Sequence, residues 1–195
     1  MTCSGSRWML VLLLLCAACM RDRFDWGQKE NFMLSQSETT LDDGSVRMEF
    51  ESLIDAPADP LFLAFSDVEH HAEFVTGVSE SKLVSSSGNT KVVDITNEVL
   101  GRPNRARIEW TIEPQKRKLS FKTIEAQYTD NSAEYVMEPS PDGTRTRVKT
   151  IYYLRDKGGH PFPLYTLRAA IRDGYVAAVS SVKRRALGPK AVVPH

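Results

Sequence analysis

Cysteine is scarce in this chain of 195 residues, and its three copies, Cys3, Cys16 and Cys19, all lie within the first nineteen positions. The remaining sequence therefore has no thiol for a disulfide, a thiolate metal site or a cysteine nucleophile. An excess of charge is missing as well, since the chain has 25 basic and 25 acidic residues. This balance gives no support for nucleic-acid binding, which generally needs a strongly basic surface. The Gly-x-Ser-x-Gly elbow of many serine hydrolases is also absent.

The chain has a short apolar run near its start, over residues 8–15, directly after Arg7. A helix that crosses a bilayer needs about 20 apolar residues, so this run is too short to span one. Small residues follow at Ala17 and Ala18, and charged residues begin at Arg21. This order predicts a secretory leader.

The segment Leu15-Cys16-Ala17-Ala18-Cys19 resembles the lipobox of bacterial lipoproteins, in which a small pair precedes the cysteine that is acylated. It departs from the usual pattern at Cys16, where Leu is common. The resemblance implies cleavage after Ala18, acylation of Cys19 and a membrane-anchored protein on the periplasmic side. Met20 after Cys19, rather than Asp, resembles the pattern of outer-membrane lipoproteins rather than inner-membrane ones. The alternative is an ordinary leader that leaves Cys19 unmodified.

These features divide the chain into four parts. We expect a signal peptide over residues 1–18, a polar tether over 19–43, a folded domain over 44–187 and a tail over 188–195. Within the tether, a weak helical or strand segment is expected around residues 31–34.

Alternating apolar and polar residues predict strands through most of the domain. Val46, Met48, Phe50 and Ile54 alternate with charged residues, which is typical of a half-buried strand. Further strands are expected over 82–84, 90–100, 105–112, 119–123, 132–137 and 144–154, separated by turn signals. Spacing of this kind predicts an antiparallel meander.

Three helices complete the pattern. Asp59 as a cap, with Pro60 at the first helical position, predicts a short helix after the first strand. A second short helix is expected over 67–75. A long amphipathic helix is expected over 164–186, ending at Gly188 and Pro189.

This order of elements resembles the helix-grip domain of the START-like (SRPBCC) superfamily, which includes polyketide cyclases, lipid-transfer domains and ubiquinone-binding proteins. The resemblance is carried by residues 54–62, by 65–68 with His70 and Phe74, and by Glu109-Trp110. It implies an α+β fold in which a curved antiparallel sheet of about seven strands wraps around the long C-terminal helix. Two short helices follow the first strand.

A single curved sheet cannot bury its inner face alone, so the long helix must lie across it. The resemblance implies that this grip leaves a mostly apolar cavity; the alternative is that the same residues fill a solid core. The candidate cavity residues are Phe50, Phe62, Phe74, Ile108, Trp110, Phe121, Tyr135, Met137, Val148, Thr150, Tyr152, Leu167, Ile171 and Tyr175.

The segment Glu69-His70-His71-Ala72-Glu73 suggests a metal site. On a helix, however, His70 and His71 point about 100° apart, and zinc generally needs three or four converging ligands. We therefore expect a solvated helix here, with no metal and no cofactor. His160 is either an acid–base group near the cavity or a plain loop residue.

Three cations, Arg145, Arg147 and Lys149, alternate along the last predicted strand. The pattern predicts a solvated sheet face, paired with acids such as Glu134 and Glu138. A contact with anionic lipid head groups is the alternative.

Together these features predict a membrane-anchored lipoprotein that binds or carries a hydrophobic small molecule, such as a lipid, a quinone or a polyketide-like compound. The expected partners are this ligand and the membrane that holds the acylated N-terminus; no nucleic acid is expected. A cyclase or aromatase enzyme is one alternative, since it needs converging polar groups around a reacting carbon. A structural lipoprotein without a ligand is the other. An apolar cavity favours the carrier, converging titratable groups favour the enzyme, and a solid core excludes both.

Overall fold

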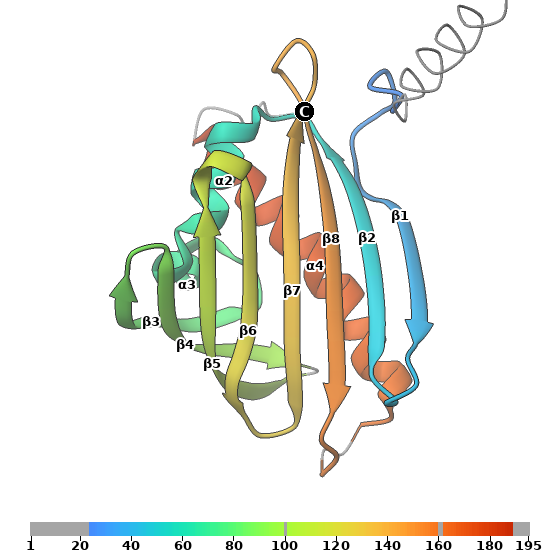
Figure 1. Ribbon diagram of the computed structural model, residues 1–195, viewed down its shortest axis with the longest axis vertical. Helices are drawn as coiled ribbons and strands as arrows, with labels where there is room; N and C mark the ends of the chain where they lie inside the picture. Colours follow the sequence, from blue (N-terminus) through green and yellow to red (C-terminus); the bar gives the residue numbers. More distant parts are fainter. Residues whose placement is uncertain (1–23, 100, 160–161, 189–195) are drawn as a thin grey trace, which may run out of the picture.

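The computed structural model describes residues 24–99, 101–159 and 162–188. They form one antiparallel sheet and a long C-terminal helix that lies across it (Figure 1). The strands are β1 Asn31–Thr40, β2 Val46–Ile54, β3 Val78–Ser87, β4 Thr90–Val99, β5 Arg102–Glu113, β6 Lys118–Ala126, β7 Thr129–Pro139 and β8 Thr146–Asp156. The helices are α2 Ala58–Ser66, α3 His71–Phe74 and α4 Leu164–Leu187, with short 3-10 turns η1 Val68–His70 and η2 Pro114–Lys116. Among these described helices, none is both long and apolar enough to span a membrane.

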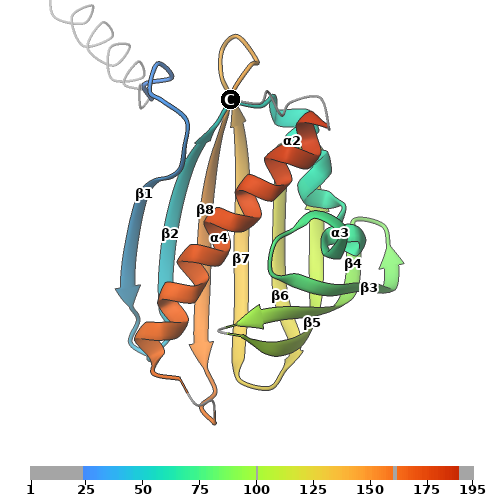
Figure 2. The same cartoon turned by 180° about the vertical axis from the view of Figure 1, so that it is seen from behind.

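The eight strands are ordered β1-β2-β8-β7-β6-β5-β4-β3, and each pairs antiparallel with its neighbours. Helix α4 crosses the inner face of the sheet diagonally (Figure 2). We call the end of the sheet where β2, β5 and β7 finish the upper end, as it is drawn in Figure 1. The lower end is where β6 and β8 finish. The α+β helix-grip fold expected from the sequence is thereby confirmed.

The sheet contains one strand more than predicted. Residues 31–40, expected within a tether, form β1 and pair with β2 from Asn31 opposite Leu53 to Thr40 opposite Val46. The strand alternative expected around residues 31–34 is confirmed, but the tether prediction was wrong for residues 35–40, which are all exposed on this edge strand. A strand with little buried surface shows no alternation of apolar and polar residues.

The seven predicted strands are confirmed, with shifts at their ends. Residues 129–131, predicted as a turn, open β7 instead. The predicted cap of the first helix was also wrong: the helix begins at Ala58 after Pro57, with no side-chain cap. Asp59 lies in its first turn and accepts a hydrogen bond from Arg117 Nε at 2.6 Å.

The alternating cations of β8 are less solvated than predicted. Arg147 is only 8% exposed; its guanidinium donates two hydrogen bonds of 2.9 Å to Glu51 and lies 4.2 Å from the centre of the Phe24 ring. Glu138 is a partner as expected, at 2.8 Å from Lys149 Nζ, whereas Glu134 pairs with Lys118. The prediction of a solvated face was wrong for Arg147 because residues N-terminal to β1 cover it.

The solid part of the core lies near the upper end. Leu61 and Phe62 of α2 belong there to one buried cluster with Met137 and Val148. Helix α2 thus fills the space between α4 and the sheet at this end. Among the described residues, no helix fills the corresponding space at the lower end (Figure 2).

Candidate functional site

A cavity of about 850 Å³ lies between α4 and the inner face of the sheet. Its volume falls within the range of about 300–1,000 Å³ that is usual for small-molecule sites. Nine of the fourteen candidate residues from the sequence line it, and their role in ligand binding stays a prediction. These nine are Phe50, Ile108, Trp110, Phe121, Tyr135, Tyr152, Leu167, Ile171 and Tyr175.

The other five candidates lie outside the cavity wall. Phe62, Met137 and Val148 belong to the solid core, and Thr150 is buried with its hydroxyl 3.4 Å from that of Tyr175. Phe74 packs edge-on against His71, and the Arg185 guanidinium lies 5.2 Å from its ring centre. The alternation of apolar and polar residues identifies the inner face of a strand. It does not show which positions on that face are covered by other side chains and which border the cavity.

The cavity wall is built largely from aromatic rings that touch one another. Trp110 and Phe121 are register partners in β5 and β6, with ring centres 5.0 Å apart. Phe121 also meets Tyr152 at 6.0 Å and Tyr135 at 6.4 Å. Such ring pairs add about 0.5–1.5 kcal/mol each beyond area burial, so they hold the wall in one arrangement. An apolar ligand therefore meets a largely preformed surface.

Two buried phenols stand in this wall. Burial raises the pKa of Tyr135 and of Tyr152 far above the ordinary value for tyrosine. Both side chains are consequently neutral hydroxyls at physiological pH, able to donate or accept a hydrogen bond but not to supply a phenolate.

His71 is a cavity residue that the sequence interpretation placed on a solvated helix. It is 7% exposed, its Nε2 lies 3.1 Å from the Phe65 carbonyl, and its ring meets Trp110 edge-on at 6.0 Å. Burial lowers the pKa of His71, so the imidazole is neutral near pH 7 and donates its Nε2 proton to that carbonyl. The missed signal was its spacing from Val68 and Val75, which places His71 on the buried side of the two short helices.

Asn97 and Asn131 supply polar groups that the sequence interpretation also missed. Both line the cavity, and both amide oxygens are buried with no hydrogen-bond partner among the described residues. A buried acceptor without a partner costs about 1–3 kcal/mol. The two positions were identifiable, since Asn97 continues the inward alternation of Val93 and Ile95, and Asn131 continues that of Ala133 and Tyr135.

The cavity opens beside the middle of α4. The exposed residues of its lining are Thr76, Gly77, Glu98, Arg102, Pro103, Asp173 and Gly174, and we call this rim the mouth. The guanidinium of Arg102 lies 5.9 Å from the ring centre of Phe162, which precedes α4. His160, predicted near this opening, lies outside the described residues.

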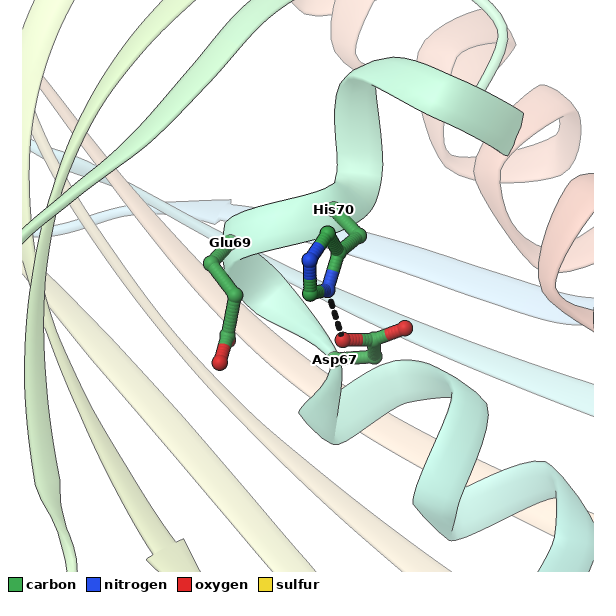
Figure 3. Close-up of side chains that lie close together, drawn as sticks. All are labelled: Asp67, Glu69 and His70. Atoms are coloured by element: carbon green, nitrogen blue, oxygen red, sulfur yellow. Dashed lines mark hydrogen bonds and ion pairs between the residues drawn. The ribbon is translucent and has the colours of Figure 1, made fainter.

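A group of three potential metal ligands lies apart from the cavity lining, at Asp67, Glu69 and His70 (Figure 3). His70 Nδ1 lies 2.5 Å from Asp67 Oδ1, and this contact raises the pKa of His70. Lys91 Nζ donates to both oxygens of Glu69 at 2.6 Å, and Arg185 reaches Asp67 at 3.4 Å. The carboxylates thus already have cationic partners on β4 and α4, so a metal ion would have to displace them.

The comparisons with known proteins agree with this geometry. A family model described as polyketide cyclase / dehydrase and lipid transport matches residues 45–186. Among curated proteins, none matches the chain.

Several solved structures are similar to the chain over most of its length. The Zhui aromatase/cyclase from a Streptomyces species is 18% identical, with a TM-score of 0.67, and the match covers 76% of this chain and 99% of that one. A START superfamily protein from Mycobacterium smegmatis is 11% identical, with a TM-score of 0.61 and coverage of 73% and 99%. A major latex-like protein from Panax ginseng is 12% identical, with a TM-score of 0.60 and coverage of 74% and 99%. At these identities the structures show the fold alone, whereas the family model, matching well over half of the residues, shows that the chain belongs to the polyketide cyclase/dehydrase and lipid transport family.

Proposed function

We propose that this protein is a membrane-anchored carrier that binds one amphipathic small molecule in its cavity. The apolar body of the ligand packs against the aromatic wall around Trp110, Phe121 and Tyr152. Hydrogen-bond donors on the ligand, such as hydroxyls, approach the side chains of Asn97 and Asn131, whose amide oxygens have no partner among the described residues. The observation that carries the proposal is the large apolar cavity, which a structural lipoprotein with a solid core would not have.

Burial of apolar surface supplies the affinity. At about 25 cal/mol per Å², covering about 300 Å² of apolar ligand surface contributes about 7 kcal/mol. The loss of ligand freedom on binding offsets part of this gain. The two unpartnered amide oxygens add specificity, since a ligand with no donor would leave them buried and unpaired.

The membrane anchor is supported by the lipobox-like residues 15–19. In this proposal the leader is removed after Ala18, Cys19 is acylated, and the domain lies on the periplasmic side of the outer membrane. Acylation also uses the one thiol that remains after removal of the leader.

A cyclase-type enzyme is the second candidate, and His71 is the observation that favours it. With its Nε2 proton donated to the Phe65 carbonyl, the neutral ring keeps a basic Nδ1. The charged residues of the cavity lining, Glu98, Arg102 and Asp173, lie at the exposed mouth rather than beside His71 in the wall. The carrier is favoured because acid–base chemistry on a bound ligand needs several polar groups around one reacting carbon.

Native mass spectrometry of the protein purified from membranes of its own host tests the carrier. We expect a single bound small molecule with a mostly apolar skeleton and at least one hydroxyl or amine. A Gly174→Trp variant should lose this ligand, because a side chain at position 174 enters open space at the mouth. Gly174→Ala is the matched control, since it changes helix propensity in the same direction without filling the opening. Ligand-free protein from the host membranes would contradict the proposal, and release of a chemically altered molecule would favour the enzyme.

A further inference from the structure

The residues directly before β1 are fixed to the domain rather than free of it. Arg145 Nη1 donates hydrogen bonds to the carbonyls of Trp26 and Gln28, the latter at 2.7 Å. The Glu30 carboxylate accepts from Lys183 Nζ at 2.6 Å and from the Asp55 backbone N–H at 2.8 Å. We call residues 24–30 the docked segment. Together with the Phe24 ring over Arg147, these contacts join it to β8, to the loop after β2 and to α4.

The docked segment lies at the upper end of the sheet, where Phe24 covers the outer face and Glu30 reaches α4 on the inner side. Asp55 follows the end of β2, and Arg145 precedes the start of β8, so both lie at the upper end. Val148 of β8 faces the core, and Arg147 beside it therefore faces outward, where Phe24 covers it. Figure 1 shows the segment leaving the sheet at the top.

The lower rim of the mouth lies toward the opposite end, whereas its other edge lies beside the upper half of α4, where the Thr76 N–H donates to Ser181 Oγ at 3.2 Å. Arg102 opens β5, Thr129 in the neighbouring wall opens β7, and Phe162 precedes α4, which places these three lining residues at the lower end. Strand β8 has 11 residues between the two ends. At about 3.3 Å per residue this strand spans about 35 Å, so the docked segment and the lower rim of the cavity are separated by nearly the full length of the sheet.

The chain between the lipobox-like cysteine and the docked segment is short. Only residues 20–23 separate Cys19 from Phe24. Five residue steps span at most about 18 Å even when fully extended. This length is about half that of β8. While the docked segment stays bound, the linking residues are therefore too short for the lower end of the domain to reach the bilayer.

We propose that the docked segment orients the domain on the membrane, with the upper end toward the bilayer and the lower rim of the mouth turned away from it. The cavity then exchanges its ligand with a partner on the aqueous side rather than with the lipids around its own anchor. The inference rests on the proposed acylation of Cys19. The orientation of the cavity relative to the membrane is new, because neither the fold nor the lipobox resemblance determines it.

Strand β6 offers a matched pair of positions for the test. Gln115 and Gln127 are both exposed and flank β6 at its upper and lower ends. Its nine residues span about 30 Å. In the acylated protein the Cys19 thiol is blocked, so Gln115→Cys or Gln127→Cys introduces the one thiol that a donor fluorophore can label. Each labelled protein is reconstituted into phosphatidylethanolamine–phosphatidylglycerol vesicles that contain a headgroup-labelled acceptor lipid.

We expect energy transfer to the lipid acceptor to be several-fold more efficient from position 115 than from position 127. An Arg145→Ala change should release the docked segment and reduce this difference, whereas Arg155→Ala, an exposed cation on the same face of β8, should leave it unchanged. Equal transfer from the two positions, or stronger transfer from position 127, overturns the orientation. Two results together would overturn both the anchor and the orientation. The host-expressed protein would incorporate no fatty acid, and it would bind vesicles as poorly as a Cys19→Ser variant. Ligand binding, read separately by native mass spectrometry, is unaffected by either result.

Discussion

Ser52 and Tyr175, 123 positions apart in the chain, share a buried hydrogen bond of 2.8 Å between Oγ and Oη. Ser52 Oγ also lies 2.7 Å from the Phe32 carbonyl, to which it donates, so the Tyr175 hydroxyl is the donor to Ser52. The Tyr175 ring stacks on Phe50 at 4.7 Å. These hydrogen bonds join β1, β2 and α4 at the border between the solid core and the cavity. They hold α4, which forms one side of the cavity, in place against the sheet.

Removal of the Tyr175 hydroxyl tests its hydrogen bond to Ser52. Tyr175→Phe keeps the ring in the cavity wall and leaves Ser52 bonded to Phe32, so we expect the free energy of unfolding to fall by only about 1 kcal/mol. Urea denaturation measures the change. Tyr165→Phe, at a side chain that is 73% exposed on the same helix, is the control and should have no effect. A loss of less than about 0.3 kcal/mol for Tyr175→Phe would show that the hydrogen bond adds nothing to stability.

The unpartnered amides of Asn97 and Asn131 predict opposite effects on stability and on binding. Replacing either residue with Leu removes a buried acceptor that has no partner among the described residues, so the ligand-free protein should keep or gain stability, by up to about 1 kcal/mol. The affinity for the copurifying ligand should fall about tenfold, the equivalent of one hydrogen bond. Thermal unfolding and ligand titration measure the two quantities. Lower stability with unchanged affinity would assign both amides to the fold rather than to the ligand.

Most of the fold was predictable because β2, β5 and β8 carry their inward residues at every second position. Alternation identifies the buried face of such strands whatever lies against it. The second half of strand β1 escaped prediction because residues 35–40 are all exposed at the sheet edge. Its place is set by backbone hydrogen bonds to β2, which any sequence without proline can form.

The candidate site was predictable in part. Trp110 and Tyr152 face inward as their strands require, but so do Met137 and Val148, and only tertiary packing by α2 decides that the latter two lie in solid core. His71 was misplaced because a short Glu-His-His segment looks polar when its helix is taken alone. Arg147 was misplaced for a related reason, since the residues that cover it lie more than a hundred positions away.

The pH dependence of stability should distinguish the two neighbouring histidines. His71 has a lowered pKa in the folded protein, so below about pH 6.5, the ordinary histidine value, the unfolded chain binds more protons than the folded one. The stabilisation linked to a neutral His71 is therefore complete above that pH and is lost as the pH falls below it. For His70, whose pKa is raised by Asp67, the contribution is present below about pH 6.5 and is lost as the pH rises.

Urea denaturation at pH 5.5 and pH 7.5 checks this expectation. His71→Gln, which can still donate to the Phe65 carbonyl, should reduce the loss of stability at the lower pH. His70→Gln is the matched control and should not reduce it. A wild-type protein equally stable at both pH values, with both variants unchanged, would contradict a buried neutral His71.

The ion pair between Arg147 and Glu51 gives a prediction for the outer face of the sheet. Two parallel hydrogen bonds of 2.9 Å join the guanidinium to the carboxylate, and the Phe24 ring covers it. Arg147→Lys keeps the charge but cannot form both bonds, so we expect the free energy of unfolding to fall by about 1–2 kcal/mol. Lys122→Arg is a fitting control, since Lys122 pairs with Glu109 at an exposed position where ion pairs contribute little. Denaturation midpoints measure both changes, and an equal effect at the two positions would show that neither the paired hydrogen bonds nor the covering ring strengthens the buried pair.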